Sequence, residues 1–228
     1  LGLGVPPTRF AVTAPGWDLA PALRVAVLGL GCAAVTLLFC HTLHLANRLL
    51  PRFLPNPWLR AAAGGAAVLA FTLVINSTRY NGAGTDVIAQ AVEQGQALPW
   101  DFLCKILFTA ITLAAGFKGG EVVPSFYVGA TFGCVAAPLL GLPAGFGAAL
   151  GLAAVFCGAT NTLVPSLVLA VELFGAPGLL YYAVVCGVCY ALTGYAGLYS
   201  HQTFLTAKLH PEYHAEIHPH HKPAPPEN

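Results

Sequence analysis

Three things are scarce in this sequence of 228 residues: methionine, charge and long apolar runs. Charged residues make up 8%, against roughly a quarter in average soluble domains, so there is too little polar surface to cover a water-soluble globule. The 10 Lys+Arg and 9 Asp+Glu nearly balance, which excludes the basic footprint of a nucleic-acid-binding protein. Disorder, which needs low hydrophobicity and high charge, is excluded for all but the C-terminal tail.

Methionine is absent altogether, and the chain opens at Leu1. Because an open reading frame begins with Met, we expect this chain to be a segment of a longer protein. The opening LGLGVPPTRF lacks a basic region followed by a sustained apolar run, so we do not expect it to be a signal peptide.

Hydrophobic residues, by contrast, reach 57%, and the mean hydropathy is +0.71, which indicates an integral membrane chain. Most of its apolar runs are shorter than the roughly 20 residues that an upright membrane span needs. They cover residues 25–40, 61–75, 106–117, 125–142, 145–158, 163–173 and 179–192, punctuated by 25 Gly and 18 Pro. The pattern predicts an all-α, polytopic membrane fold with tilted, broken helices, which many transporters use to build a midplane binding site. A re-entrant or interfacial helix pair without a transport role is the alternative.

Polar segments separate the runs. Residues 47–60, with three Arg and three Pro, predict an interfacial loop anchored by Trp58, on the cytoplasmic face by the positive-inside rule. Residues 85–94 have helical spacing, with Thr85 as N-cap. After Lys208 we expect a solvated tail, whose histidines at 210, 214, 218, 220 and 221 lack the accompanying ligands of a metal site.

Cysteine is odd in number, which argues against a disulfide framework. Cys186 and Cys189 form a C-x-x-C pattern, a redox or zinc signal in a soluble protein. Here the pair lies in the apolar sequence LLYYAVVCGVCYAL, so we interpret both as small helix-packing residues.

The segment GFKGGEVVPSFYVGATFG, residues 116–133, places Lys118 and Glu121 between two apolar runs. An ionisable residue within a membrane segment is a candidate functional residue. Gly120 lets the backbone approach a ligand closely, and Pro124 suits the first turn of a helix. The free N–H groups of that helix start could bind an anion. The alternative is a tight turn in which Lys118 and Glu121 simply pair.

Two further places carry polar groups. In GYAGLYSHQTF, residues 194–204, a Tyr hydroxyl could donate to an anion, although an interfacial aromatic belt is also consistent and His201 is interpreted as structural. Glu172 interrupts the run LVPSLVLAVELFG. As a buried carboxylate it could move protons, or it could mark a helix end before Gly175 and Pro177.

Four ordered segments resemble the CLC family of chloride channels and anion/proton antiporters: NGAGTDVI, GGEVVPSFYVGATFG, GATNTLVPSLVLAVELFG and GLYSHQTF. The resemblance runs from about residue 1 to 208 and corresponds to the second half of the family's inverted repeat. It implies a homodimer in which each subunit has its own anion pathway. It also implies that the anion is held by the backbone amides of Glu121 and Val122 and by the hydroxyl of Tyr199.

GGEV followed by a polar residue and Pro is characteristic of the family's fluoride/proton antiporter branch. Glu121 matches that branch, whereas Val123 stands where the branch has Thr. The family's gating glutamate and serine-containing anion loop belong to the first half, which this sequence does not contain, and its cytoplasmic nucleotide-binding domains are also missing.

The sequence therefore predicts a transmembrane half over residues 1–208 and a tail over 209–228. We expect a multi-pass protein of a bacterial inner or plasma membrane that moves chloride or fluoride, with protons as a candidate counter-ion, and neither an enzyme nor a holder of a metal or cofactor. The anion-binding candidates are Gly120, Glu121, Val122, Val123 and Tyr199, with Lys118 and Glu172 as pathway or proton-linked residues. A non-transporting membrane scaffold remains the alternative.

Overall fold

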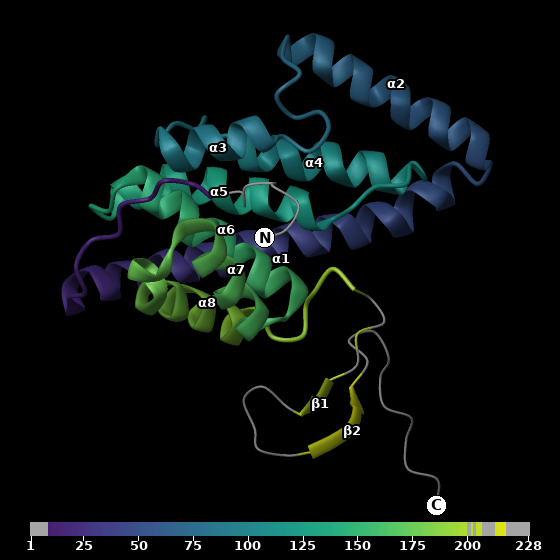
Figure 1. Ribbon diagram of the computed structural model, residues 1–228. Helices are drawn as coiled ribbons and strands as arrows, with labels where there is room; N and C mark the ends of the chain where they lie inside the picture. Colours follow the sequence, from purple (N-terminus) through teal and green to yellow (C-terminus); the bar gives the residue numbers. More distant parts are fainter. Residues whose placement is uncertain (1–8, 200–201, 203, 207–212, 218–228) are drawn as a thin grey trace, which may run out of the picture.

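A computed structural model describes residues 9–199, 202, 204–206 and 213–217 (Figure 1). Helices dominate the described residues, and each apolar run of the sequence lies within or largely within one of them. In chain order the elements are α1 (Leu19–Phe53), α2 (Pro57–Ile75), α3 (Thr85–Glu93), α4 (Asp101–Ala114), α5 (Val122–Leu139), α6 (Ala144–Thr160), α7 (Leu163–Phe174), the short 3-10 helix η1 (Ala176–Gly178), α8 (Leu179–Thr193), β1 (Phe204–Thr206) and β2 (Tyr213–Ile217).

The interfacial loop expected over residues 47–60 is mostly helical, which corrects that prediction. The 35-residue α1 continues through Pro51 to Phe53, and α2 begins at Pro57 with Asn56 as its N-cap. Pro51 is tolerated because it lies in the last turn, where little helix follows the kink. At 1.5 Å per residue α1 is about 52 Å long, more than an upright span requires. Trp58 is 85% exposed on the first turn of α2.

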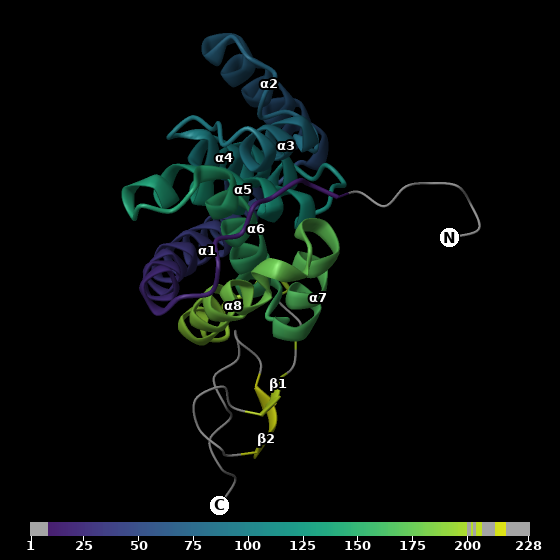
Figure 2. The same cartoon turned by 60° about the vertical axis from the view of Figure 1, so that its left-hand side comes forward.

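Among the described residues, four helices are long and apolar enough to cross a membrane: α1, α2, α5 and the segment Ala176–Thr193. The apolar helices α6 and α7 are shorter, in agreement with the predicted broken helices. In both views α2 projects away from the other helices (Figures 1 and 2), and Gly64 is its one buried residue among those described.

The predicted helix over residues 85–94 is present as α3, with a shifted start. Gly84, rather than Thr85, is the N-cap, and it adopts a left-handed conformation (φ 72°). Glycine is the residue that adopts this conformation without strain. A side chain at this position would also overlap the ring of Tyr127, so the turn packs directly against α5.

Helices α5 and α6 form the most closely packed pair, and glycines of both helices lie at the point where they cross. Gly129 and Gly133 of α5 face Gly151 and Gly147 of α6, and a Cβ added at any of the four would overlap backbone of the opposite helix. Such small-residue spacing lets membrane helices approach closely. Nearly all of α6 is buried, so it forms the centre against which α1, α5 and α8 pack.

The seven cysteines, all within the described residues, form no disulfide, and six of them are buried. Cys189 contacts the hydroxyl of Thr36 across the α1–α8 interface, and the thiol of Cys157 contacts the carbonyl of Cys186. These contacts agree with the interpretation of Cys186 and Cys189 as helix-packing residues.

The helical fold class is confirmed, with one addition. β1 and β2 form an antiparallel hairpin that makes no contact with the described helices and lies apart from them in both views. No regular structure was predicted after residue 208, where β2 lies. However, YHAEI alternates apolar and polar residue types, the two-residue period of a strand.

Candidate functional site

The first turn of α5 has backbone N–H groups that are free to donate hydrogen bonds. Glu121 is the N-cap, and the first intrahelical bond runs from the Ser125 amide to the Glu121 carbonyl. Pro124 has no N–H, so the orphan donors of this helix start are the amides of Glu121, Val122 and Val123. Within the described residues none of the three has a hydrogen-bond acceptor. Three aligned N–H groups at the positive end of an 18-residue helix form a site suited to an anion.

The loop after α8, which carries Tyr199, is fixed against the end of α6. The amide of Leu198 donates to the Ala159 carbonyl (2.8 Å), and the side-chain amide of Asn161 donates to the Ala196 carbonyl (3.2 Å). Gln202 adds a bond to the Thr160 carbonyl. The backbone before and after Tyr199 is therefore held in place.

His44 of α1 contacts this loop. Its Nε2 lies 2.8 Å from the Gly197 carbonyl oxygen, so Nε2 carries a proton and donates it. Burial raises the pKa of the Glu121 carboxyl, and nearby His44 partly offsets this rise. Sequence reasoning missed His44 because it stands alone in a helical segment, 77 positions from Glu121 and 153 from Gly197. Only tertiary packing brings the three together.

The remaining predicted site residues fall in different surroundings. Tyr199 is 47% exposed, and its hydroxyl makes no hydrogen bond within the described residues. Gly120 is exposed with open space where a side chain would be. Lys118 is exposed and forms no ion pair with Glu121, so the described structure lacks the paired turn that was the alternative.

Glu172 is exposed on the last turn of α7, two residues before that helix ends. This position corresponds to the helix-end alternative rather than to a buried carboxylate. His201 and the tail histidines at 210, 218, 220 and 221 lie outside the described residues. For His214, in β2, only the backbone is described.

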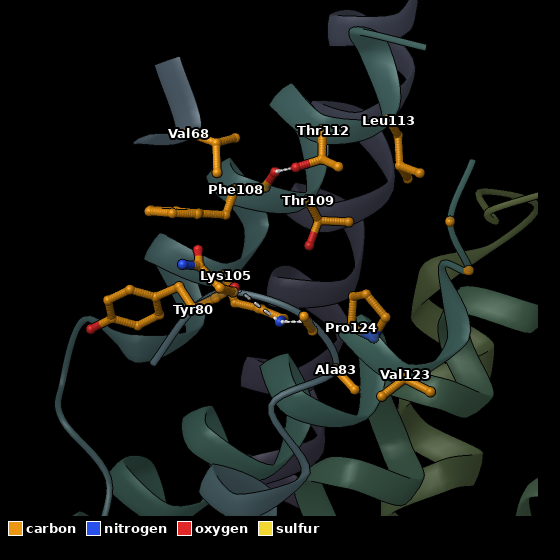
Figure 3. Close-up of a pocket in the computed structure, with 14 residues that line it drawn as sticks. Val68, Tyr80, Ala83, Lys105, Phe108, Thr109, Thr112, Leu113, Val123 and Pro124 are labelled. Atoms are coloured by element: carbon orange, nitrogen blue, oxygen red, sulfur yellow. Dashed lines mark hydrogen bonds between the residues drawn. The ribbon is translucent and has the colours of Figure 1, made fainter. Parts of the chain in front are cut away.

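A cavity of about 470 Å³ lies between α4 and the first turn of α5 (Figure 3). One wall is formed by Gly119, Gly120, Val123 and Pro124, which are the residues around the predicted anion site. The opposite wall includes Lys105 and Thr109 of α4. Neither of these two residues was predicted from the sequence to have a role.

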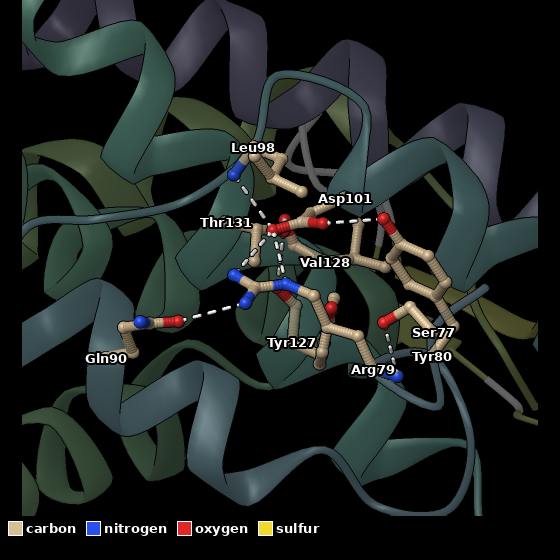
Figure 4. A network of polar contacts seen from close by, with 9 residues as sticks. All are labelled: Ser77, Arg79, Tyr80, Gln90, Leu98, Asp101, Tyr127, Val128 and Thr131. Carbon is tan, nitrogen blue, oxygen red and sulfur yellow. Dashed lines mark hydrogen bonds and ion pairs between the residues drawn. The ribbon is translucent and has the colours of Figure 1, made fainter. Parts of the chain in front are cut away.

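A buried polar network holds the loop between α2 and α3 against α4 (Figure 4). Asp101 is fully buried and accepts hydrogen bonds from Arg79 (3.0 Å to Nη2), from the Tyr80 hydroxyl (2.8 Å) and from the Leu98 amide. Gln90 accepts from Arg79. Burial and the hydrogen bond to Asp101 raise the pKa of the Tyr80 phenol, so it remains a proton donor at neutral pH.

The comparison with known proteins agrees with this architecture. The sequence profile described as "voltage gated chloride channel" matches residues 2–194, so the chain belongs to this family of integral membrane proteins. It is 37% identical over 201 residues to a chloride/fluoride channel protein of Pseudomonas syringae pv. tomato, covering 86% of this chain and 44% of that protein. Its fold matches the crystal structure of a CLC-type fluoride/proton antiporter with a TM-score of 0.82 and 33% identity.

That structural match covers 86% of this chain and 50% of the antiporter chain. The chain thus spans about half the length of the relatives it matches. This agrees with the expectation that it corresponds to one half of a CLC-type protein, and it confirms the family resemblance identified in the sequence.

Proposed function

We propose that the protein containing this chain moves a small halide across a membrane, and that the start of α5 is the anion site of this half. The observation that carries the proposal is the set of unbonded amides on Glu121, Val122 and Val123. Backbone donors bind an anion without the desolvation cost of a buried cation. The membership in the chloride channel family supports the same ligand class.

Tyr199 supplies a hydroxyl donor to the same anion. Its backbone is anchored to α6 on one side and, through Gly197, to His44 on the other. Gly120 leaves the approach to the helix start open, because no side chain occupies that position. Lys118, exposed just before it, adds positive charge to the entrance.

The transported anion is fluoride, exchanged for protons. Glu121 supplies a carboxyl group next to the anion, and burial raises the pKa of this group, an effect that nearby His44 partly offsets. The two relatives named above are described as a chloride/fluoride channel and a fluoride/proton antiporter, which supports this choice over chloride alone. Glu172 is not part of the proposed proton route, because it is exposed on the last turn of α7.

In this proposal residues 1–208 form the transmembrane half and residues 209–228 a short tail. The complete protein is a homodimer in the lipid bilayer of a bacterial inner or plasma membrane. Its dimeric state is measurable by light scattering in detergent.

Ion efflux from liposomes containing the complete protein tests the function. Fluoride and chloride are followed with separate electrodes while pH is recorded on both sides. We expect fluoride efflux with opposing proton movement. Chloride efflux without proton movement would reject the fluoride/proton exchange and leave a general halide pathway. If neither ion moves through a folded, dimeric protein, the non-transporting scaffold replaces the transport function.

A further inference from the structure

Lys105 is a buried cation without a carboxylate partner. Its side chain is 2% exposed, and its ammonium donates to the carbonyls of Tyr80 (3.1 Å) and Gly82 (2.7 Å). It also lies 4.8 Å from the centre of the Tyr127 ring. These groups are dipoles and a ring face, and none of them neutralises the charge. The ion pair present in the described residues is Arg79–Asp101, which excludes Lys105.

The nearest polar network does not balance this charge. Asp101 lies one turn earlier on α4, and its carboxylate is already matched by the guanidinium of Arg79 at 3.0 Å. Arg79, Asp101 and Lys105 therefore sum to one net positive charge inside the protein. Burying a charge without a counter-ion costs free energy. We therefore expect an anion from outside these residues to lie near the Lys105 ammonium.

The cavity beside Lys105 can hold that anion. Lys105 and Thr109 lie on its α4 wall, and Figure 3 shows the Thr109 hydroxyl directed toward the space beside Pro124. Within the described residues this hydroxyl has no hydrogen-bond partner, although Thr109 is only 8% exposed. A volume of about 470 Å³ exceeds the roughly 30 Å³ of one water many times over, so a small anion fits together with part of its hydration shell.

We propose that this cavity is a second anion site, in which the Lys105 ammonium and the Thr109 hydroxyl bind a small halide as the counter-ion of the buried lysine. Two carbonyl bonds occupy two of the three ammonium protons, and the third is available for the anion. Because Gly120 and Val123 form the opposite wall, an anion held here lies on the approach to the amides of α5. The choice of halide as the anion rests on the proposed function.

Bromide soaked into crystals of the complete protein tests the site directly, since its anomalous scattering locates it. We expect one peak between Lys105 and Thr109 and another at the start of α5. A peak only at α5 would overturn the cavity site and leave the proposed function intact. A peak only in the cavity would support the second site and reject the helix start. Bromide at neither place would reject both.

Matched variants test whether the site acts in transport. Lys105→Gln keeps a donor for the loop carbonyls and removes the charge, whereas Lys105→Arg keeps the charge. Thr109→Val removes the hydroxyl at nearly constant volume. We expect Lys105→Gln and Thr109→Val to raise the KM for halide efflux about tenfold or more at an unchanged maximal rate, with Lys105→Arg close to the parent.

A purely structural role for Lys105 gives a different result. Lys105 would then act only by tying the Tyr80–Gly82 backbone to α4, Thr109→Val would leave KM unchanged, and the maximal rate of Lys105→Gln would fall together with its folded yield. That combination would overturn the second anion site. A carboxylate of the remainder of the protein seated on Lys105, visible in the same crystals, would also overturn it.

Discussion

At the residue scale, the Tyr199 hydroxyl is the side-chain donor that we propose for the anion. Its backbone is fixed by bonds of its neighbours to α6 and α1, while its own hydroxyl makes none within the described part of the chain. Because the backbone is already fixed, only the side chain of Tyr199 has to be ordered when its hydroxyl binds an anion.

We therefore expect Tyr199→Phe to weaken halide binding by about 1.5–3 kcal/mol, the value of a hydrogen bond to a charged group. Calorimetry on the complete protein measures the change. Tyr182→Phe is the matched control, because that ring packs against Phe146 and Phe174 in the core. Equal halide affinity in Tyr199→Phe and the parent would remove Tyr199 from the site.

Val123 is the second residue with a specific consequence. It is the second residue of α5, and its amide is one of the three unbonded donors. The fluoride-exporting branch that the sequence resembles carries Thr at this position, which would add a hydroxyl beside the anion at nearly the same volume.

We expect Val123→Thr to raise the ratio of fluoride to chloride efflux by about two- to tenfold, which corresponds to one hydrogen bond worth about 0.5–1.5 kcal/mol. Parallel electrode recordings on parent and variant liposomes measure the ratio. Val128→Thr, a fully buried position one and a half turns further along α5, is the control for a hydroxyl added elsewhere. A ratio that does not change would show that position 123 does not set selectivity.

At the scale of helices, the position of α5 depends on its glycine contact with α6. Gly133 of α5 packs against the backbone of Gly147 and Gly151, so Gly133→Ala forces the two helices apart. We expect a loss of about 1–3 kcal/mol of stability, the typical cost of overpacking. Thermal unfolding of the purified protein measures it. Gly187→Ala on α8, where no atom of another element lies within 4 Å of an added Cβ, should unfold at the temperature of the parent.

The contact of His44 with the Gly197 carbonyl joins helix α1 to the loop after α8. We expect His44→Ala to weaken anion binding about fivefold, because the Tyr199 loop loses an anchor worth about 1 kcal/mol. His44→Gln retains a donor at the place of Nε2 and should restore most of the binding.

Comparing the two variants isolates the contribution of the loop bond, because His44→Gln keeps this bond and His44→Ala removes it. If the alanine and glutamine variants lose the same affinity, the loop bond is not what His44 contributes.

At the scale of the whole molecule, anion binding should appear in stability. A ligand that binds only the folded state stabilises it by RT ln(1 + [L]/Kd), about 2.7 kcal/mol at a hundredfold excess over Kd. We expect fluoride to raise the unfolding midpoint of the complete protein in detergent, relative to gluconate at the same ionic strength. An unchanged midpoint at saturating fluoride would favour the scaffold.

Sequence alone determined the membrane class, the apolar helices and the candidate anion segment of this protein. These are local properties, since hydropathy, Gly and Pro spacing and the Pro at a helix start act within a few residues of one another. It placed Glu121 and Val122 at a helix start and Tyr199 in a loop, and it identified the family. The continuation of α1 through Pro51 was not predicted. Three prolines within residues 47–60 suggested a loop, whereas Pro51 lies in the last turn of the helix and does not end it.

Only the tertiary structure decided which distant groups meet. His44, Glu121 and Gly197 converge from three elements, and Arg79 neutralises Asp101 while leaving Lys105 without a counter-ion. Long-range pairing depends on how helices cross, and here the crossing is set by glycines on α5 and α6 that permit backbone contact. Which buried charges pair with one another depends on that packing. The sequence therefore contains Arg79, Asp101 and Lys105 but does not show that Lys105 is the one left without a carboxylate partner.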